Sequence, residues 1–273
     1  SSSAHIRIIG DLMLGSDPGA AFTAIIQIGT ELAVILYFRH DIIRILGAWF
    51  GSLFGKEGKD FKSRMGAHNP DTQMGWFIIL GTMPILIAGL LFKHAIEGSL
   101  RNLWITVTVL ALFGVLLWVV DARSKQVKTM KEMTWKDALI FGIGQMLALI
   151  PGVSRSGGTI TFGRAMGYTR EAAVRVSFLM AIPAVFGAGI LEAVSAVKDV
   201  AAGDAGMFPG WGPTIAAAIV AFVVGYVVII GFLKFVSTFS YKAFAIYRIG
   251  LAIVVALLLI TGVLSPLEAA AAA

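Results

Sequence analysis

Long apolar runs separated by polar links make up most of this chain. Six of the runs are close to or above the roughly 20 residues that a helix needs to cross a bilayer. They cover residues 22–38, 74–92, 103–120, 172–191, 213–236 and 243–264. The pattern predicts an all-α, polytopic membrane protein with six transmembrane helices.

One further apolar run, residues 138–163, is interrupted by a polar stretch. It is too short to cross the membrane twice, so we expect a re-entrant helical hairpin that returns to the side it left. Its turn, residues 151–159, reads PGVSRSGGT and is expected at membrane depth. An arginine there costs about 2.5 to 3.5 kcal/mol even on the most lenient insertion scale, so Arg155 needs an anionic partner or an aqueous cavity.

The residue types of this turn suit a phosphate group. Glycines let backbone N–H groups point toward one place, serine and threonine hydroxyls add donors, and a guanidinium fits two phosphate oxygens. A helix broken by proline and glycine, with its arginine extended to the membrane surface, is the alternative.

Two of the links carry most of the positive charge. Residues 39–71 and 121–137 are rich in lysine and arginine, whereas the other links are near neutral or acidic. By the positive-inside rule both basic links face the cytoplasm, two crossings apart. Within the first, which we expect to be a long polar loop, residues 42–54 form an amphipathic segment that is expected to lie along the membrane surface.

Composition agrees with a membrane protein and excludes other classes. Of the 273 residues, 58% are hydrophobic and 14% charged, which is outside the range of soluble domains. Cytoplasmic loops beside anionic lipid account for the net charge of +6, so we expect no nucleic acid partner. Without cysteine the chain holds no disulfide, zinc thiolate site or iron–sulfur cluster.

The two halves of the chain, residues 1–120 and 138–264, show a weak internal similarity. In each half a serine-containing polar segment is followed, at a similar distance, by three predicted spans. Because three crossings separate the segments, they enter from opposite sides, as in an inverted repeat, and can meet near the midplane. By this symmetry the first arm of a second hairpin is expected before Ser1. Residues 265–273 are expected to be a tail of cloning origin, so residues 1–264 form a single membrane domain.

Titratable side chains at membrane depth are the candidates for chemistry. His5 lies in the first polar segment, and an imidazole with a pKa near its ordinary value of about 6.5 acts as a base or nucleophile at neutral pH. A packing histidine at a helix start is the alternative. Glu31 interrupts the first span, and it either has a function, pairs with Arg155 or Arg248, or stays protonated. Arg248, near the start of the last span, is expected to extend to the inner surface.

These residues resemble the motifs of the undecaprenyl pyrophosphate phosphatase family, also called the bacitracin resistance protein family. Residues 151–159 are similar to the family's PGxSRSGxT segment over its whole length, and residues 1–5, SSSAH, resemble the end of its first motif. Residues 26–29, IQIG, and 245–248, AIYR, are further matches. The resemblance extends over essentially the whole chain.

The resemblance implies a phosphatase of the bacterial cytoplasmic membrane that hydrolyses undecaprenyl pyrophosphate to undecaprenyl phosphate and inorganic phosphate, recycling the lipid carrier for cell-wall synthesis. It also implies six spans and two re-entrant hairpins in inverted repeats. Arg155 would hold the pyrophosphate, and whether His5 or Ser2 attacks stays open. The candidate catalytic residues are His5, Arg155, Ser154 and Ser2, and the candidate substrate-binding residues are Ser3, Gln27, Gly152, Ser156, Gly157, Gly158 and Thr159.

A divalent cation such as Mg²⁺ or Ca²⁺ is a further implication of the resemblance. The family's first motif begins with an acidic E/QxxxE stretch, and its carboxylates are expected before Ser1. Glu31 is a weak candidate metal ligand because its position does not match that motif. The expected partners are undecaprenyl pyrophosphate and membrane lipid, and a homodimer is one expectation for the oligomeric state.

Two other functions also fit an inverted repeat with broken helices. A lipid-carrier or anion transporter is the first alternative, and a non-catalytic membrane scaffold is the second. Because function resides in the site and not in the fold, the specific turn at residues 151–159 favours the phosphatase.

Overall fold

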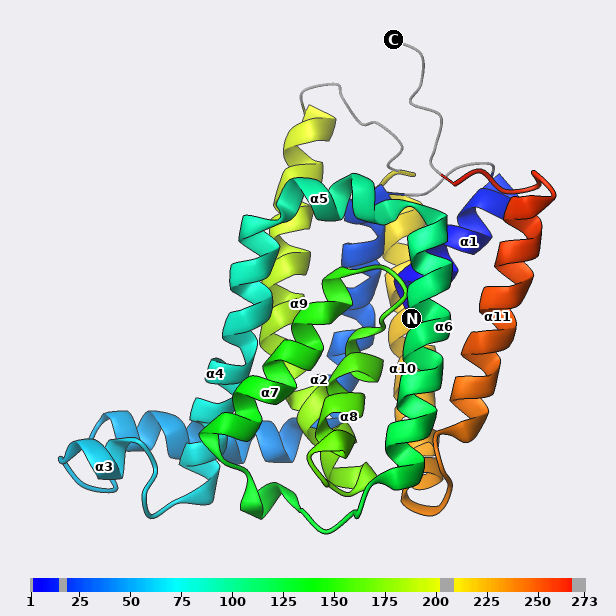
Figure 1. Cartoon of the computed structure of the whole chain (residues 1–273). Helices are drawn as coiled ribbons and strands as arrows, with labels where there is room; N and C mark the ends of the chain where they lie inside the picture. Colours follow the sequence, from blue (N-terminus) through cyan, green and yellow to red (C-terminus); the bar gives the residue numbers. More distant parts are fainter. Residues whose placement is uncertain (1, 15–18, 202–208, 267–273) are drawn as a thin grey trace.

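A computed structural model gives the structure of residues 2–14, 19–201 and 209–266. In these ranges the chain is helical, apart from turns and one isolated bridge between Lys128 and Tyr168 (Figure 1). The longer elements are α1 Ser2–Leu14, α2 Gly19–Leu53, α4 Pro70–Leu91, α6 Leu103–Arg123, α7 Trp135–Met146, α8 Arg155–Ala165, α9 Arg170–Ala201, α10 Trp211–Thr238 and α11 Lys242–Ile260. The shorter ones are α3 Phe61–Arg64, α5 Lys93–Glu97 and the 3₁₀ turns Ser99–Arg101, Met130–Glu132 and Leu147–Leu149.

Five helices in the described part of the chain are long and apolar enough to cross a membrane. They are Pro70–Leu91, Leu103–Arg123, Arg170–Ser195, Trp211–Thr238 and Lys242–Ile260, and they coincide with five of the six predicted spans. The remaining one, residues 22–38, lies inside α2, which is not among the five. Many large apolar side chains of α10 are exposed, as a helix in contact with lipid requires. The protein is therefore a multi-pass membrane protein.

Local sequence signals explain where several helices begin. Asn69 caps α4 by accepting from the backbone N–H of Asp71, and Pro70 occupies the first helical position, where its missing N–H costs nothing. Thr134 and Asp137 form a capping box at the start of α7. These caps place the two basic links immediately before a membrane-length helix and before the hairpin.

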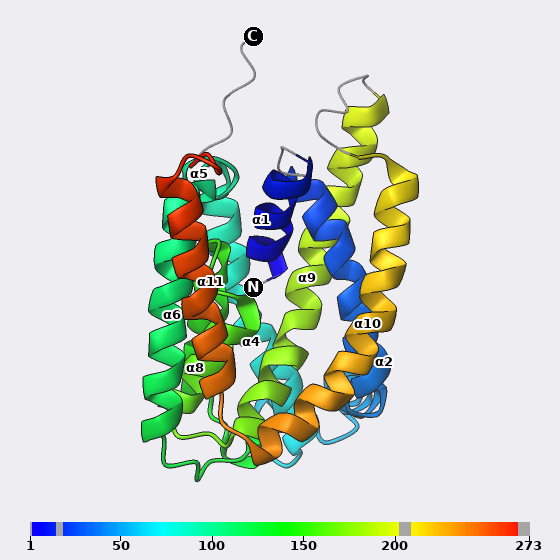
Figure 2. The ribbon, with the colours of Figure 1, turned by 90° about the vertical axis from the view of Figure 1, so that its right-hand side faces the viewer.

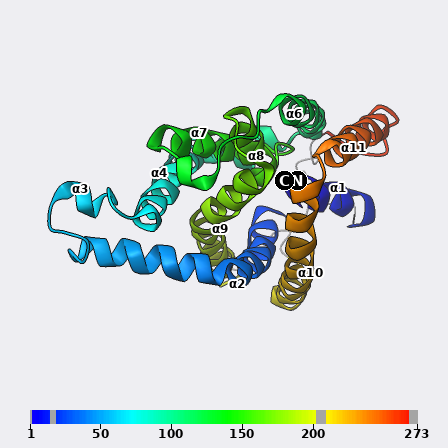
Figure 3. The ribbon, with the colours of Figure 1, turned by 90° about the horizontal axis from the view of Figure 1, so that it is seen from below.

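Two sequence predictions about loops were wrong. The polar segment that contains Ser2 and His5, which we expected to be a loop, is the beginning of helix α1. The predicted loop at residues 39–71 is helical as far as Leu53, because α2 continues without a break beyond the apolar run. The second half of α2 turns away from the bundle axis and runs across the lower end of the molecule (Figures 1 and 3). This direction agrees with the prediction that residues 42–54 lie along the membrane surface.

Over the segment predicted as a hairpin, residues 138–163, the structure has two short helices, α7 and α8, that pack against each other. The two arms approach so closely that a Cβ on Gly158 would lie 2.3 Å from the carbonyl oxygen of Gly144, so a larger residue cannot occupy that position. The hairpin is part of the main buried cluster, through Ala138, Phe141 and Ile160. It is therefore an element of the protein core and not a surface loop.

The two basic links lie at the same end of the molecule, as the positive-inside prediction requires. Figure 1 shows the outer part of α2, helix α3 and the link from α6 to α7 at the lower end. Helices α1 and α8 both begin near the middle of the bundle, and they run toward opposite ends (Figures 1 and 2).

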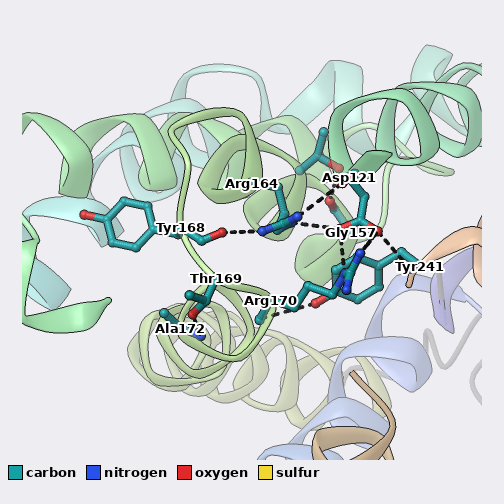
Figure 4. A network of polar contacts seen from close by, with 9 residues as sticks. Asp121, Gly157, Arg164, Tyr168, Thr169, Arg170, Ala172 and Tyr241 are labelled. Carbon is teal, nitrogen blue, oxygen red and sulfur yellow. Dashed lines mark hydrogen bonds and ion pairs between the residues drawn. The ribbon is translucent and has the colours of Figure 1, made fainter. Parts of the chain in front are cut away.

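A buried polar network at the lower end ties four parts of the chain together (Figure 4). Asp121, at the end of α6, accepts from Nε of Arg164 at 2.8 Å and from Nε of Arg170 at 2.9 Å. It also accepts from the backbone N–H of Tyr241 at 3.1 Å. Arg164 is fully buried and donates in addition to the carbonyl of Tyr168. One carboxylate thus compensates two arginines where the hairpin, α9 and α11 meet α6.

Replacing this carboxylate is expected to destabilise the protein strongly. Asp121→Asn leaves Arg164 buried without a counter-charge, which costs about 3 to 5 kcal/mol of unfolding free energy. Thermal or chemical unfolding in detergent measures the loss. The matched control is Glu171→Gln, at an exposed carboxylate 3.5 Å from Arg175, where a change of less than about 1 kcal/mol is expected. Equal stability of the two variants would contradict the role of the network.

Candidate functional site

The turn of the hairpin has a backbone that few sequences can adopt. Gly152 has φ of +104°, and a Cβ on it would lie 2.5 Å from the carbonyl oxygen of Thr106 on α6, so only glycine fits. Ser154 has φ of +70°, a conformation that costs a non-glycine residue on the order of 1 to 3 kcal/mol. Its side chain caps α8 by accepting from the N–H of Gly157 at 3.3 Å. Strain of this kind is typical of functional sites.

Arg248 of α11 holds this turn in place. Its Nη2 donates to the carbonyl oxygens of Gly152 at 2.8 Å and Val153 at 3.0 Å, and the residue is only 6% exposed. A Cβ on Gly157 would lie 2.8 Å from Nη1, so the guanidinium also lies against the first turn of α8. The prediction that Arg248 extends to the surface was wrong, because carbonyls in a non-helical turn inside a membrane protein need donors.

Arg155, the first residue of α8, was predicted to need an anionic partner or an aqueous cavity, and it has an anionic partner. Its Nη2 donates to Oε1 of Glu31, and its Nη1 donates to the carbonyl of Ala181 at 3.4 Å. Of the alternatives open for Glu31, the structure shows pairing with Arg155. The Glu31 side chain is 1% exposed and that of Arg155 is 25% exposed. The second carboxylate oxygen of Glu31 has no hydrogen-bond partner among the described residues.

His5, on α1, contacts α11 through Tyr247, the residue next to Arg248. Its Nε2 is 2.7 Å from Oη of Tyr247, and the two rings are stacked with centroids 5.7 Å apart. Ala4 of α1 belongs to the same buried apolar cluster as Leu110 of α6. A Cβ on Gly152 would contact the backbone of that same residue, Leu110. The structure therefore brings the start of α1 and the hairpin turn to the same stretch of α6 and α11.

The other predicted site residues differ in how they are placed. Ser2 is exposed at the start of α1, and Ser156 is half-buried in the first turn of α8. Gln27 is half-buried on α2, one turn before Glu31. The side chain of Ser3 lies outside the described residues.

The remaining three residues of the predicted cradle are buried in α8. Gly157 lies against Arg248, and Gly158 lies against Gly144 of the other hairpin arm. Thr159 is buried, and its hydroxyl donates to the carbonyl of Arg155 at 2.8 Å. Gly158 and Thr159 therefore shape the start of α8 instead of facing an open site.

Sequence reasoning missed two polar residues of this region. One is Arg248 as the donor to the turn carbonyls. The other is Gln145 on α7, which is fully buried and whose amide nitrogen and oxygen have no partner among the described residues. The signal for Gln145 was a polar residue inside the apolar run before the turn. The signal for Arg248 was its presence in a segment that also carries the family resemblance.

The charges of the site favour an anion. Arg155 and Arg248 are opposed by one carboxylate, Glu31, and the positive end of the α8 dipole points the same way. The first backbone N–H groups of a helix have no intrahelical acceptor, so they are available to phosphate oxygens. In the described part of the chain, no group of three or more His, Cys, Asp or Glu side chains could hold a metal ion.

A separate apolar cavity of about 410 Å³ lies between α2, α4 and α9. Its lining residues include Ile45, Trp49, Leu86, Ile182 and Pro183. The lining suits hydrocarbon, and the charged groups of the hairpin turn are not part of it.

Membrane-length helices and a strained, arginine-bonded turn inside their bundle define a multi-pass membrane protein with a buried polar site. The chain belongs to the family described as Bacitracin resistance protein BacA, which it matches over residues 1–254. It is 92% identical to an undecaprenyl-diphosphatase of Bifidobacterium adolescentis over 273 residues, which are 100% of this chain and 93% of the relative.

Two further relatives with the same name are more distant. An undecaprenyl-diphosphatase of Bifidobacterium animalis subsp. lactis is 77% identical over 98% of this chain and 90% of its own length. One of Pseudarthrobacter chlorophenolicus is 52% identical over 97% of this chain and 92% of its own length.

The close approach of the turn to α6 gives a test of the site geometry. Gly152→Ala is expected to lower the unfolding free energy by about 2 to 3 kcal/mol, because the new Cβ meets the α6 backbone at a φ that alanine disfavours. The matched control is Gly89→Ala in α4, where a Cβ meets nothing within 4 Å. That change is expected to be neutral or to stabilise the helix by up to about 1 kcal/mol. Unfolding monitored by tryptophan fluorescence compares the two, and an undisturbed Gly152→Ala protein would contradict the described packing.

Proposed function

We propose that this protein is a membrane phosphatase that hydrolyses undecaprenyl pyrophosphate to undecaprenyl phosphate and inorganic phosphate, and so recycles the lipid carrier for cell-wall synthesis. The family to which the chain belongs and the names of its relatives support this function. Coverage of nine tenths or more of each of these relatives means that the likeness includes nearly their whole length.

The observation that carries the chemistry is the start of α8, where Arg155, the Ser154 cap and the first backbone N–H groups of the helix converge. A diphosphate bound there has its negative charge matched by fixed donors and a guanidinium. As the bond to the bridging oxygen breaks, charge develops on the departing undecaprenyl phosphate, and the same groups stabilise it. Arg248 keeps the turn in position for this task through its bonds to the turn carbonyls.

The attacking group is supplied by α1. Ser2 and His5 are three residues apart on that helix and therefore share one face. Either His5 or Ser2 is the nucleophile, or His5 removes a proton from an attacking water. The imidazole ring is held by Tyr247, whose Oη lies 2.7 Å from its Nε2. In the water route, one P–O bond forms to the water oxygen, the P–O bond to the bridging oxygen breaks, and the proton goes to the imidazole.

Two of the residues expected from the sequence to contact the substrate make other contacts in the structure. Thr159 was expected to donate to the phosphate, but its hydroxyl is already bonded to the carbonyl of Arg155. Gly158 was expected in the cradle, but it is required where the two hairpin arms touch. We assign both residues to positioning, together with Gly157, whose N–H is bonded to the Ser154 side chain, and keep Ser154 and Ser156 as donors to the substrate.

The proposed topology is six spans and two re-entrant hairpins in inverted repeats, in a bacterial cytoplasmic membrane. Support comes from the five long apolar helices, from the opposite directions of α1 and α8, and from the packing of α2 against α9 (Figure 2). The basic lower end would face the cytoplasm. A homodimer stays a prediction.

A divalent cation such as Mg²⁺ or Ca²⁺ stays a prediction from the family resemblance. Glu31 is the one carboxylate that the described residues bring to Arg155, so these residues do not by themselves fit a resident cation, and no step is derived through one. Phosphate release measured with EDTA and after return of Mg²⁺ or Ca²⁺ tests the prediction. A reversible loss supports it, and an unchanged rate contradicts it.

Removing either proposed catalytic side chain is expected to abolish most activity. Arg155→Ala and His5→Ala should each lower phosphate release from undecaprenyl pyrophosphate by about 100-fold or more, because a fixed charge and a base or nucleophile are lost. The matched controls are Arg123→Ala and His40→Ala, at exposed positions, and both should keep near-normal rates.

These rates are measured on purified protein with release of inorganic phosphate as the readout. Near-normal turnover by Arg155→Ala or His5→Ala would refute the assignment of the site. Uptake of a lipid carrier or anion into liposomes without phosphate release would instead favour the transporter.

A further inference from the structure

A negative charge lies inside a site that is proposed to bind a diphosphate. The Glu31 side chain is 1% exposed, and its second oxygen has no partner among the described residues. A carboxylate in this position repels phosphate, and its burial is unfavourable in itself. The hydrolysis described above does not use it.

The packing of α2 fixes Glu31 in this position. Val34 and Phe38, three and seven residues further along and on the same face of the helix, are buried in the main core. The ring of Phe38 also lies 6.0 Å from the ring of Phe178 on α9. Arg155 is held less tightly, at the start of a helix and with a side chain that is 25% exposed.

The contacts of Arg155 place Glu31 in competition with a phosphate group. A guanidinium has five N–H donors, and a carboxylate and a phosphate oxygen both prefer its planar fork. Glu31 occupies part of that fork. A phosphate group that binds to Arg155 therefore competes with Glu31 for the same donors.

We propose that Glu31 is a counter-charge that limits the affinity of Arg155 for phosphate groups, so that the products leave the site. This inference rests on the proposed function. Glu31 touches Arg155 and not the reacting atoms, so it is a positioning residue. A purely structural role, in which Glu31 only keeps Arg155 in place, predicts the opposite change in affinity when its charge is removed.

Glu31→Gln separates these two roles. The amide oxygen still accepts from Arg155 and the side-chain volume is nearly unchanged, but the negative charge is gone. The purified protein is titrated by calorimetry with inorganic phosphate and with methylenediphosphonate, a diphosphate that cannot be hydrolysed. Both are expected to bind about tenfold more tightly than to the unsubstituted protein, because one repulsive charge in a poorly screened site has been removed.

The kinetic counterpart is a split between KM and kcat. Inhibition by inorganic phosphate and by undecaprenyl phosphate should strengthen about tenfold, KM should fall, and kcat should fall because the products leave slowly. A loss of affinity or an unchanged affinity for phosphate overturns the proposal.

Three further variants complete the test. Glu31→Ala removes the charge and the acceptor together and should also bind phosphate more tightly, which covers the case in which Glu31→Gln does not fold. Glu31→Gln combined with Arg155→Ala should lose the gain in affinity, since the coupling passes through Arg155. Glu171→Gln makes the same chemical change at an exposed position and should leave binding unchanged.

The binding measurement does not depend on catalysis. An unsubstituted protein that binds the two probes but releases no phosphate from undecaprenyl pyrophosphate would contradict the proposed function alone. An active protein whose Glu31→Gln variant binds phosphate with equal or lower affinity would contradict the counter-charge alone.

Discussion

The structure depends on one constraint: polar groups that leave the water must find partners within the protein. A turn inside a membrane bundle exposes carbonyls and N–H groups that no helix satisfies. Here Arg248 donates to the carbonyls of Gly152 and Val153, and Ser154 accepts from the N–H of Gly157. Arg155 finds its counter-charge in Glu31 on another helix. The site exists because these partners come from α2, α8 and α11 together.

Two buried arginine clusters in this protein differ in a way that separates stability from function. In the cluster around Asp121, the carboxylate oxygens are bonded to two arginines and a backbone N–H. In the cluster at the hairpin turn, an oxygen of Glu31 and Nε of Arg248 lack partners in the described residues. Unsatisfied buried groups destabilise a fold, so their presence beside a strained serine is more typical of a functional site than of a purely structural cluster.

Much of the fold could be predicted from the sequence because hydropathy acts over a whole helix. The five membrane-length helices and the pair α7 and α8 follow from the length of the apolar runs. The position of both basic links at the same end of the molecule follows from their charge alone. The length of α2 could not be predicted in this way, since the helix continues into a polar segment that lies along one end of the bundle. The helical start of α1 was missed because its serines read as a loop.

The candidate site was predicted in part. Arg155 and its need for a counter-charge follow from the cost of burying a cation, but which acid pairs with it depends on how α2 packs beside α8. Arg248 was misplaced because an arginine near the end of a span more often extends to the surface. Its partners are the carbonyls of Gly152 and Val153, which are 96 and 95 residues away in the sequence. No local sequence pattern reveals contacts over such a distance.

The central claim is that the first turn of α8 and Arg155 together bind a diphosphate inside the membrane bundle. An experimental structure of the protein with a prenyl methylenediphosphonate tests it most directly. The account predicts that the phosphonate groups contact the Arg155 guanidinium and the backbone N–H groups that follow Ser154, with the prenyl chain directed toward lipid. Phosphonates bound to the lysines and arginines of the basic lower end, with Arg155 and Glu31 undisturbed, would contradict it.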